Sequence, residues 1–281
     1  MHFTATRTTP SIQLLVDRST SMLEPITDAT TMTKFAAVRA ALVGPGGVVT
    51  QLQSKALFGA SLYTHLDTPC PELRSVPRAF SNRTAIATLI DTTTPMGATP
   101  TGPAIDAAVG SFGTSPPTAE TPRYIVLATD GLPNSCPGDP VNANTWAVQA
   151  AAAAHAAKIQ LIVLAIDTNL PTSHLQELAN AGAGQPGAPY YVATNPGALT
   201  TTLDTIIGGI VSCELTISGR VDPPQAGNGV VRLDGQPLLY GLEWTMAGPS
   251  TLRILGGACT ALRTIPNASI DATFPCGTVI F

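Results

Sequence analysis

Charged residues are scarce in this chain, since only 11% of its 281 residues are Asp, Glu, Lys or Arg, and the net charge is −4. The Lys and Arg residues are scattered, so they create no basic field that would attract phosphates, and we expect no nucleic-acid partner. Apolar residues make up 44% of the chain. That share is enough for a large buried core, which excludes an intrinsically disordered chain.

Membrane-spanning and export signals are also lacking. The longest apolar candidate, the Ala-rich stretch 146–157, is too short to cross a bilayer and contains Gln149 and His155. We therefore expect no transmembrane segment. The first ten residues have neither the basic start nor the apolar run of a signal peptide. If the protein is exported, its leader is expected to lie outside this sequence.

Common catalytic and zinc-binding signatures are missing too. The sequence has no Gly-x-Ser-x-Gly, no phosphate-binding Gly-rich Lys loop and no His-Glu-x-x-His, so we do not expect an enzyme. None of the five cysteines forms a Cys-x-x-Cys pair. Cys70, Cys136 and Cys276 lie beside Pro in loop-like segments, which favours disulfides over the alternative of buried free thiols. Disulfides indicate an oxidising compartment, so we expect a secreted, periplasmic or cell-surface protein.

What the sequence does contain is a regular alternation of strand-length and helix-length segments. Strands are expected at 11–17, 56–64, 124–129, 159–166 and 189–193, with helices at 33–43, 84–92, 101–112, 145–158, 173–181 and 196–211. This order predicts a doubly wound α/β fold whose mainly parallel sheet is covered on both faces. After Cys213 the pattern changes to short alternating runs and Asn-Gly or Asp-Gly turns, which are typical of antiparallel strands. We therefore predict two domains, an α/β domain over residues 1–212 and a small antiparallel β domain over 213–281.

Acidic and hydroxyl side chains follow the expected strands. Asp17 ends the first strand and is followed by Ser19 and Ser21, Asp130 follows the strand that ends at residue 129, and Thr99 lies in a hydroxyl-rich loop that opens a helix. Ligands of parallel sheets bind beyond the carboxyl ends of the strands, so these segments are expected to meet at one edge. The Asp-x-Ser-x-Ser segment alone is more typical of a helix N-cap. All three segments together favour a shared site.

Two carboxylates and three hydroxyls suit a hard cation such as Mg²⁺ or Mn²⁺, with Ca²⁺ also open. Such a set neutralises the charge of the ion but leaves a coordination position free for an incoming acidic group. The expected chemistry is therefore capture of a carboxylate on a protein or other ligand. A metal-assisted hydrolase, in which the ion would polarise a phosphoryl or carbonyl group, and a structural cell-surface protein are the alternatives.

The segments Leu-Leu-Val-Asp-Arg-Ser-Thr-Ser-Met, Gly-Ala-Thr-Pro-Thr-Gly and Thr-Asp-Gly resemble the metal ion-dependent adhesion site of von Willebrand factor A domains, and the likeness covers roughly residues 11–212. It implies a metal-dependent binding or adhesion protein. The implied metal ligands are Asp17, Ser19, Ser21, Thr99 and Asp130. Thr101 is an alternative to Thr99, which the family pattern favours.

The same resemblance suggests disulfide pairs. Cys70 and Cys136 resemble the pair that flanks the metal loops in secreted bacterial members, and Cys259 with Cys276 looks like a second pair. Cys213 is then either a free thiol or a replacement for one member of the second pair, because sequence alone does not fix connectivity. The oligomeric state is left open.

Overall fold

The structure is a computed structural model, and it describes residues 1–7, 9–26, 31–67, 69–114, 121–137, 142–167, 170–211, 213–265 and 268–280. The chain divides into two compact units. The larger unit is Pro10–Ile207, and the smaller unit combines Met1–Thr9 with Gly208–Phe281.

The larger unit is built on a mixed six-stranded sheet in the order β4-β3-β2-β5-β6-β7. All neighbouring strands are parallel except β4, which runs antiparallel to β3 at one edge. Every residue of β2 is buried, as expected for a central strand covered on both faces. The strands are β2 (Ser11–Asp17), β3 (Leu57–Thr64), β4 (Glu72–Ala79), β5 (Arg123–Thr129), β6 (Ile159–Ile166) and β7 (Tyr191–Ala193).

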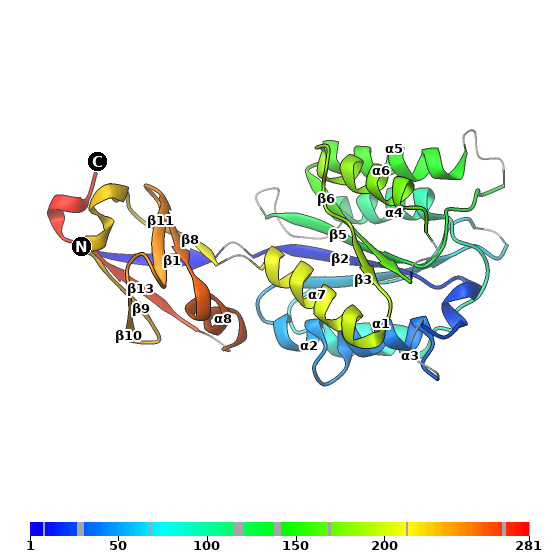
Figure 1. Cartoon of the computed structure of the whole chain (residues 1–281), viewed down its shortest axis with the longest axis horizontal. Coiled ribbons are helices and arrows are strands. Elements are labelled where there is room, and N and C mark those ends of the chain that lie inside the picture. Colours follow the sequence, from blue (N-terminus) through cyan, green and yellow to red (C-terminus); the bar gives the residue numbers. More distant parts are fainter. Residues whose placement is uncertain are drawn as a thin grey trace. The chain divides into compact units, whose positions relative to one another are not determined.

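Helices cover both faces of this sheet (Figure 1). On one face lie α4 (Thr101–Thr114), α5 (Ala143–Ala156) and α6 (Thr172–Ala183), whose small and branched side chains pack on the inner residues of the strands. On the other face lie α1 (Lys34–Val43), α2 (Val48–Leu52), α3 (Arg83–Asp91) and α7 (Pro196–Ile210). The predicted doubly wound, mainly parallel architecture is confirmed.

Two elements of the larger unit were not expected from the sequence. The edge strand β4 is mostly exposed or half-buried, so it has no apolar run that would mark it as a strand. The short helix α2 follows the bend at Gly44–Gly47 and is too short to show a helical period. β4 forms through its antiparallel pairing with β3, and α2 packs on α1, so each depends on the preceding element rather than on its own pattern.

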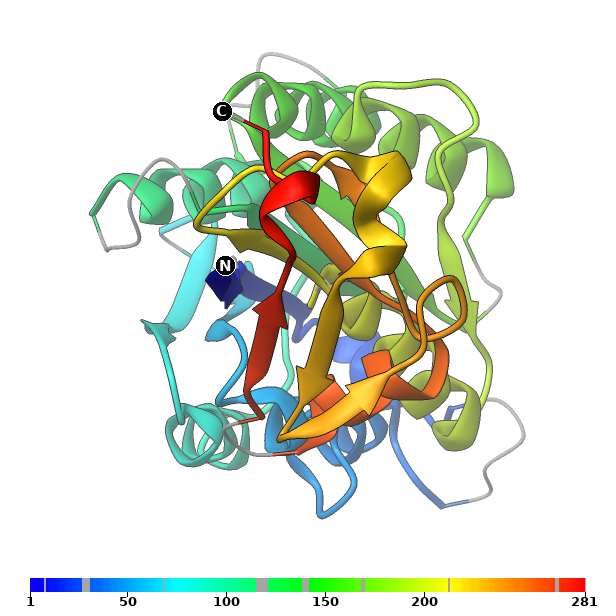
Figure 2. The ribbon, with the colours of Figure 1, turned by 90° about the vertical axis from the view of Figure 1, so that its left-hand side faces the viewer.

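The smaller unit is an antiparallel sheet of seven strands in the order β10-β9-β13-β1-β8-β12-β11 (Figures 1 and 2). The predicted small antiparallel domain is therefore present. Its strands are β1 (His2–Arg7), β8 (Glu214–Ile217), β9 (Val230–Leu233), β10 (Gln236–Leu238), β11 (Trp244–Gly248), β12 (Thr251–Ile254) and β13 (Ile270–Thr273), and the helix α8 (Gly256–Thr264) follows β12.

The N-terminal strand belongs to this smaller sheet, whereas the sequence placed it in the α/β domain over 1–212. β1 lies in the centre and pairs with β13 on one side and with β8 on the other. Phe3 of β1 packs with Phe274 and Trp244 in the core of the smaller unit. The predicted domain ranges 1–212 and 213–281 therefore have to be corrected. The smaller unit consists of Gly208–Phe281 together with Met1–Thr9, because a strand from the other end of the chain completes its sheet.

In the smaller unit a disulfide joins Cys213 to Cys259, and Cys276 is free and exposed. The predicted Cys259–Cys276 pair is wrong, and Cys213 instead takes the place of Cys276. The reason lies in strand pairing: β8 begins directly after Cys213 and pairs with β12, and Ile254 N donates to Cys213 O at 2.9 Å. Helix α8 then carries Cys259 to a Cα–Cα distance of 5.6 Å from Cys213.

Among the described residues, one stretch, Lys34–Leu52, would be long and apolar enough to cross a membrane by length and composition. It consists of α1 and α2, and most of it is buried inside the structure. A core element of an α/β domain has the same composition, so this stretch is weak evidence for a membrane span.

Candidate metal centre

Parallel pairing brings two of the predicted ligands to the same edge of the larger sheet. β2 and β5 are neighbours, with Val16 opposite Ala128, so Asp17 and Asp130 both lie at the carboxyl end of their strands. Both are buried, with exposed fractions of 0% and 3%. Thr129 Oγ1 donates to Asp17 Oδ2 at 2.8 Å and so connects the ends of the two strands.

The turn after β2 adds two hydroxyls to this edge. Ser19 N donates to Asp17 Oδ1 at 2.8 Å, and the hydroxyls of Ser19 and Ser21 lie 3.0 Å apart. Ser21 Oγ in turn donates to Asp130 Oδ1 at 2.8 Å. Four of the five predicted ligands therefore form one hydrogen-bonded cluster. Ser19 does precede the short 3-10 helix Thr20–Leu23 as its N-cap, but its side chain makes no capping hydrogen bond.

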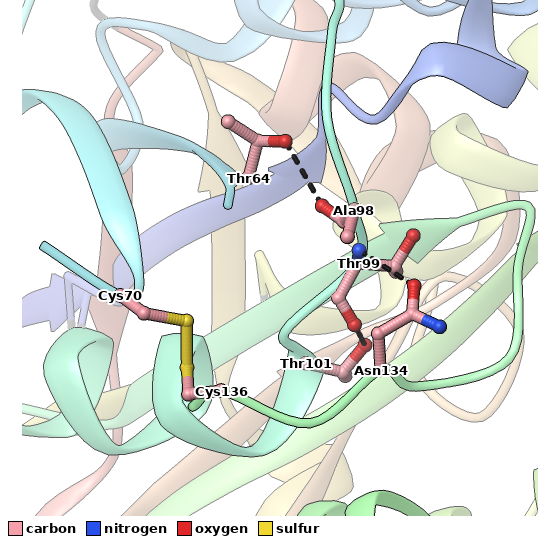
Figure 3. The surroundings of a disulfide bond; sticks show 7 residues. All are labelled: Thr64, Cys70, Ala98, Thr99, Thr101, Asn134 and Cys136. Carbon is pink, nitrogen blue, oxygen red and sulfur yellow. Dashed lines mark hydrogen bonds between the residues drawn. A yellow bond between two sulfur atoms is a disulfide. The ribbon is translucent and has the colours of Figure 1, made fainter. Parts of the chain in front are cut away.

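The loop that carries Thr99 is held against the end of β3 (Figure 3). Thr64 Oγ1 donates to Ala98 O at 2.9 Å, and Ala98 N donates to His65 O at 2.7 Å. This approach needs a glycine at position 97, where φ is +77° and a Cβ atom would lie 2.3 Å from His65 O. The Thr64 side chain at the end of β3 and the backbone of His65 just after it thus position the Thr99 loop.

Thr99 shares a small space with Ser21 beside Gly131. A Cβ atom on Gly131 would lie 3.5 Å from Thr99 Oγ1 and 4.0 Å from Ser21 Oγ, so both hydroxyls lie within van der Waals distance of the same point. Thr101 is turned elsewhere, since its buried hydroxyl lies 3.3 Å from Tyr63 Oη. The geometry therefore favours Thr99 over Thr101 as the fifth member of the cluster.

A disulfide beside the Thr99 loop links the loop after β3 to the loop after β5 (Figure 3). Cys70, in the loop after β3, is bonded to Cys136, in the loop after β5. The pair predicted from the resemblance is present. Because the bond links residues 66 positions apart, it restricts the unfolded chain as well as the two loops beside the candidate site.

The cluster places two buried carboxylates, Asp17 and Asp130, close enough for their charges to interact. Burial away from water raises the pKa of Asp17 to about 6, and the neighbouring negative charge of Asp130 adds to this, whereas the hydrogen bonds from Ser19 and Thr129 act in the opposite direction. A carboxyl group in such surroundings is stabilised as the anion by a nearby cation. Its partners in the structure, Ser19 N and Thr129 Oγ1, are neutral donors.

Three charged residues at this edge, Lys34, Glu24 and Asp167, were not predicted from the sequence. Lys34, the first residue of α1, lies 2.8 Å from Asp130 Oδ2, 3.0 Å from Glu24 Oε2 and 3.8 Å from Asp167 Oδ2. Burial lowers the pKa of Lys34, but its hydrogen bonds to Asp130 and Glu24 outweigh this and raise it overall. A signal was available in the sequence: a cation in the first turn of a helix is disfavoured by the helix dipole, so its presence indicates nearby acidic groups.

Arg18 and Asn134, which flank the predicted ligands in sequence, play supporting roles. The buried Arg18 guanidinium pairs with Glu72 of β4. Thr99 N donates to Asn134 Oδ1 at 2.9 Å, so Asn134 positions the Thr99 loop.

The donor set fits a hard cation. It offers carboxylate and hydroxyl oxygens only, which are ligands preferred by Mg²⁺, Mn²⁺ and Ca²⁺. The described residues contain no group of three or more His, Cys, Asp or Glu arranged to hold a metal ion. The predicted set falls outside that description because only two of its five members are carboxylates.

Comparisons with known proteins identify the fold. The sequence matches no protein-family profile and no curated protein sequence. The structure is similar to BatB from Bacteroides thetaiotaomicron, with a TM-score of 0.54 and 18% identity over 72% of this chain and 98% of BatB. It is also similar to the manganese-loaded TRAP protein of Plasmodium vivax, with a TM-score of 0.52 and 16% identity over 71% of this chain and 74% of TRAP.

The larger unit has a von Willebrand factor A-like fold. The pilus adhesin SpaC of Lactobacillus rhamnosus GG is a further structural neighbour, with a TM-score of 0.59 and 14% identity. The likeness covers 94% of this chain and 39% of SpaC. At these identities the likeness concerns the fold. The cluster of Asp17, Ser21 and Asp130 lies at the carboxyl edge of the A-like sheet, where ligands of parallel sheets bind.

Proposed function

We propose that this chain is a secreted or cell-surface binding protein that captures an acidic group of a protein or other ligand through one divalent metal ion. The larger unit, called the A-like unit from here on, would hold the ion through Asp17, Ser19, Ser21, Thr99 and Asp130. The ion would supply a positive charge with a coordination position open to a ligand carboxylate. The proposal includes no catalytic turnover.

The observation that carries the proposal is the gathering of oxygen atoms from three separate loops. Ser21 Oγ contacts both Ser19 Oγ and Asp130 Oδ1, at 3.0 and 2.8 Å, and the space beside Gly131 is bordered by Ser21 Oγ and Thr99 Oγ1. Buried polar groups placed so closely are typical of a site that binds a charged partner. The raised pKa of Asp17 supports the same view, since a bound cation would favour its carboxylate.

The structural neighbours support binding as the general role. One is a pilus adhesin, and the TRAP structure was loaded with manganese. The two disulfides, Cys70–Cys136 and Cys213–Cys259, support an oxidising location outside the cytosol.

The first test is calorimetric titration of the metal-free protein with Mg²⁺ and with Mn²⁺. We expect one ion to bind the wild type and none to bind Asp17→Asn at the same concentrations. Asp271→Asn, which changes an exposed carboxylate of the smaller unit, is the matched control and should bind like the wild type. Absence of metal binding to the wild type, or equal binding to Asp17→Asn, would refute the proposed site.

The second test concerns the captured group. A short peptide with a Glu side chain should bind the Mn²⁺-loaded protein, whereas the same peptide with Gln in that position should not. EDTA should abolish binding of the Glu peptide. Equal binding of both peptides would show that the metal does not recognise a carboxylate.

A further inference from the structure

Lys34 brings a positive charge into the candidate metal centre. Its side chain is buried, with an exposed fraction of 2%, and its ammonium group lies 2.8 Å from Asp130 Oδ2. Burying an ammonium group is costly unless it is paired and hydrogen-bonded. At this position it also opposes the dipole of α1, so only the surrounding carboxylates explain its place.

The ammonium group and the serine hydroxyl share Asp130 between them. Lys34 Nζ donates to Oδ2, whereas Ser21 Oγ donates to Oδ1 and is itself 3.0 Å from Ser19 Oγ, so Oδ1 is the oxygen that connects Asp130 to the serine hydroxyls. Lys34 therefore neutralises Asp130 without occupying the side of the carboxylate that the cluster uses. Asp17, by contrast, is held by the neutral donors Ser19 N and Thr129 Oγ1.

The same ammonium group connects three segments of the A-like unit. Glu24 follows the turn after β2, Asp130 follows β5, and Asp167 follows β6. A divalent ion in the centre would join two of these segments again, through Ser21 and Asp130. Lys34 thus holds together, without metal, the edge that the ion would hold together.

We propose that Lys34 is a tethered cation that stabilises the metal-free centre and weakens its affinity for divalent ions. This inference rests on the proposed metal-binding function and deepens it, because Lys34 would raise the concentration of the ion that is needed to load the site. The physical reason is that an ammonium group and a metal ion on the same carboxylate repel one another, and burial reduces the screening of that repulsion.

The variant Lys34→Met tests this inference, because it removes the charge while keeping an unbranched side chain that helices tolerate. We expect it to bind Mn²⁺ at least about tenfold more tightly than the wild type in calorimetric titration. We also expect it to melt at a lower temperature than the wild type in EDTA and to gain more stability from added Mn²⁺. Arg39→Met, on the exposed side of the same helix, is the control and should leave Mn²⁺ affinity unchanged.

The outcomes separate this inference from the proposed function. Equal or weaker Mn²⁺ binding by Lys34→Met than by a wild type that binds Mn²⁺ overturns the inference and leaves the function standing. Binding by the variant but not by the wild type supports the inference and overturns the function. Binding by neither overturns both. If Lys34→Met does not fold even with Mn²⁺, Lys34→Gln, which is uncharged but can still donate to Asp130, is measured in the same way and decides between these outcomes.

Discussion

Asn134 holds the backbone of Thr99 on both sides: Thr99 N donates to Asn134 Oδ1 at 2.9 Å, and Asn134 N donates to Thr99 O at 2.8 Å. The pair ties the loop after β5 to the loop that opens α4. Thr99 Oγ1 is thereby placed near Ser21 although the two residues come from different loops.

The variant Asn134→Ala is expected to weaken Mn²⁺ binding by about 10- to 100-fold, because residues that position metal ligands contribute on this scale. The variant loses the hydrogen bond from Thr99 N to Asn134 Oδ1, whereas the hydrogen bond from the backbone N of residue 134 to Thr99 O is kept. Calorimetric titration measures it, and Asn228→Ala, in the smaller unit, should bind like the wild type. An unchanged affinity of Asn134→Ala would show that Thr99 needs no support from this side chain.

The variant Asp130→Asn is expected to destabilise the metal-free protein by about 3 kcal/mol, because it removes the nearest carboxylate from the buried ammonium group of Lys34. Urea denaturation in EDTA measures the free energy of unfolding. Asp91→Asn removes the partner of Arg39 in an exposed ion pair and should cost less than about 1 kcal/mol. Similar losses in the two variants would contradict the importance assigned to the buried pair.

Replacing both Cys70 and Cys136 by Ser is expected to lower stability by about 4 kcal/mol, since the disulfide closes a long loop in the unfolded chain. Mn²⁺ affinity should fall as well, because both loops beside Thr99 gain freedom. Cys276→Ser changes an exposed free thiol and should alter neither property. Thermal melting under oxidising conditions compares the three proteins, and a double variant as stable as the wild type would refute the expectation.

The variant Gly97→Ala is expected to be destabilised by more than about 1 kcal/mol, because a left-handed backbone disfavours a Cβ atom and the atom would clash with His65 O. Gly110→Ala provides the opposite case, since it lies inside α4 with open space around it. That variant should be more stable than the wild type by about 1 kcal/mol. Urea denaturation measures both, and losses of similar size would argue against a special backbone at Gly97.

His174 predicts a loss of stability in mild acid. It is buried in α6, and this burial lowers its pKa below the usual 6.5, an effect that Glu177 only partly offsets. The unfolded chain therefore takes up a proton more readily than the folded chain, so this contribution is present above pH 6.5 and is lost as the pH falls below it. His174→Leu should flatten that part of the stability–pH curve, whereas the exposed His155→Leu should leave it unchanged. A curve unaltered by His174→Leu would assign the acid sensitivity to other groups.

Apart from β4 and α2, the order of strands and helices in the larger, A-like unit follows from the sequence alone, because each of the other elements carries its own apolar pattern and the ends of parallel strands meet at one edge. That rule predicts that Asp17 and Asp130 lie at the same edge, and the pairing of β2 with β5 confirms it. It also indicated a site of oxygen ligands, since the local segments contain Asp, Ser and Thr without His or Cys nearby.

Only the tertiary structure decided which distant segments pair. β1 lies in the smaller sheet because its partners are β8 and β13; Cys213 is bonded to Cys259 because β8 pairs with β12. Lys34 reaches Asp130 across 96 positions in the sequence. A local pattern specifies the period and the buried face of a segment, but the identity of its neighbour depends on the packing of the whole unit, and so does the charge balance of the candidate metal centre.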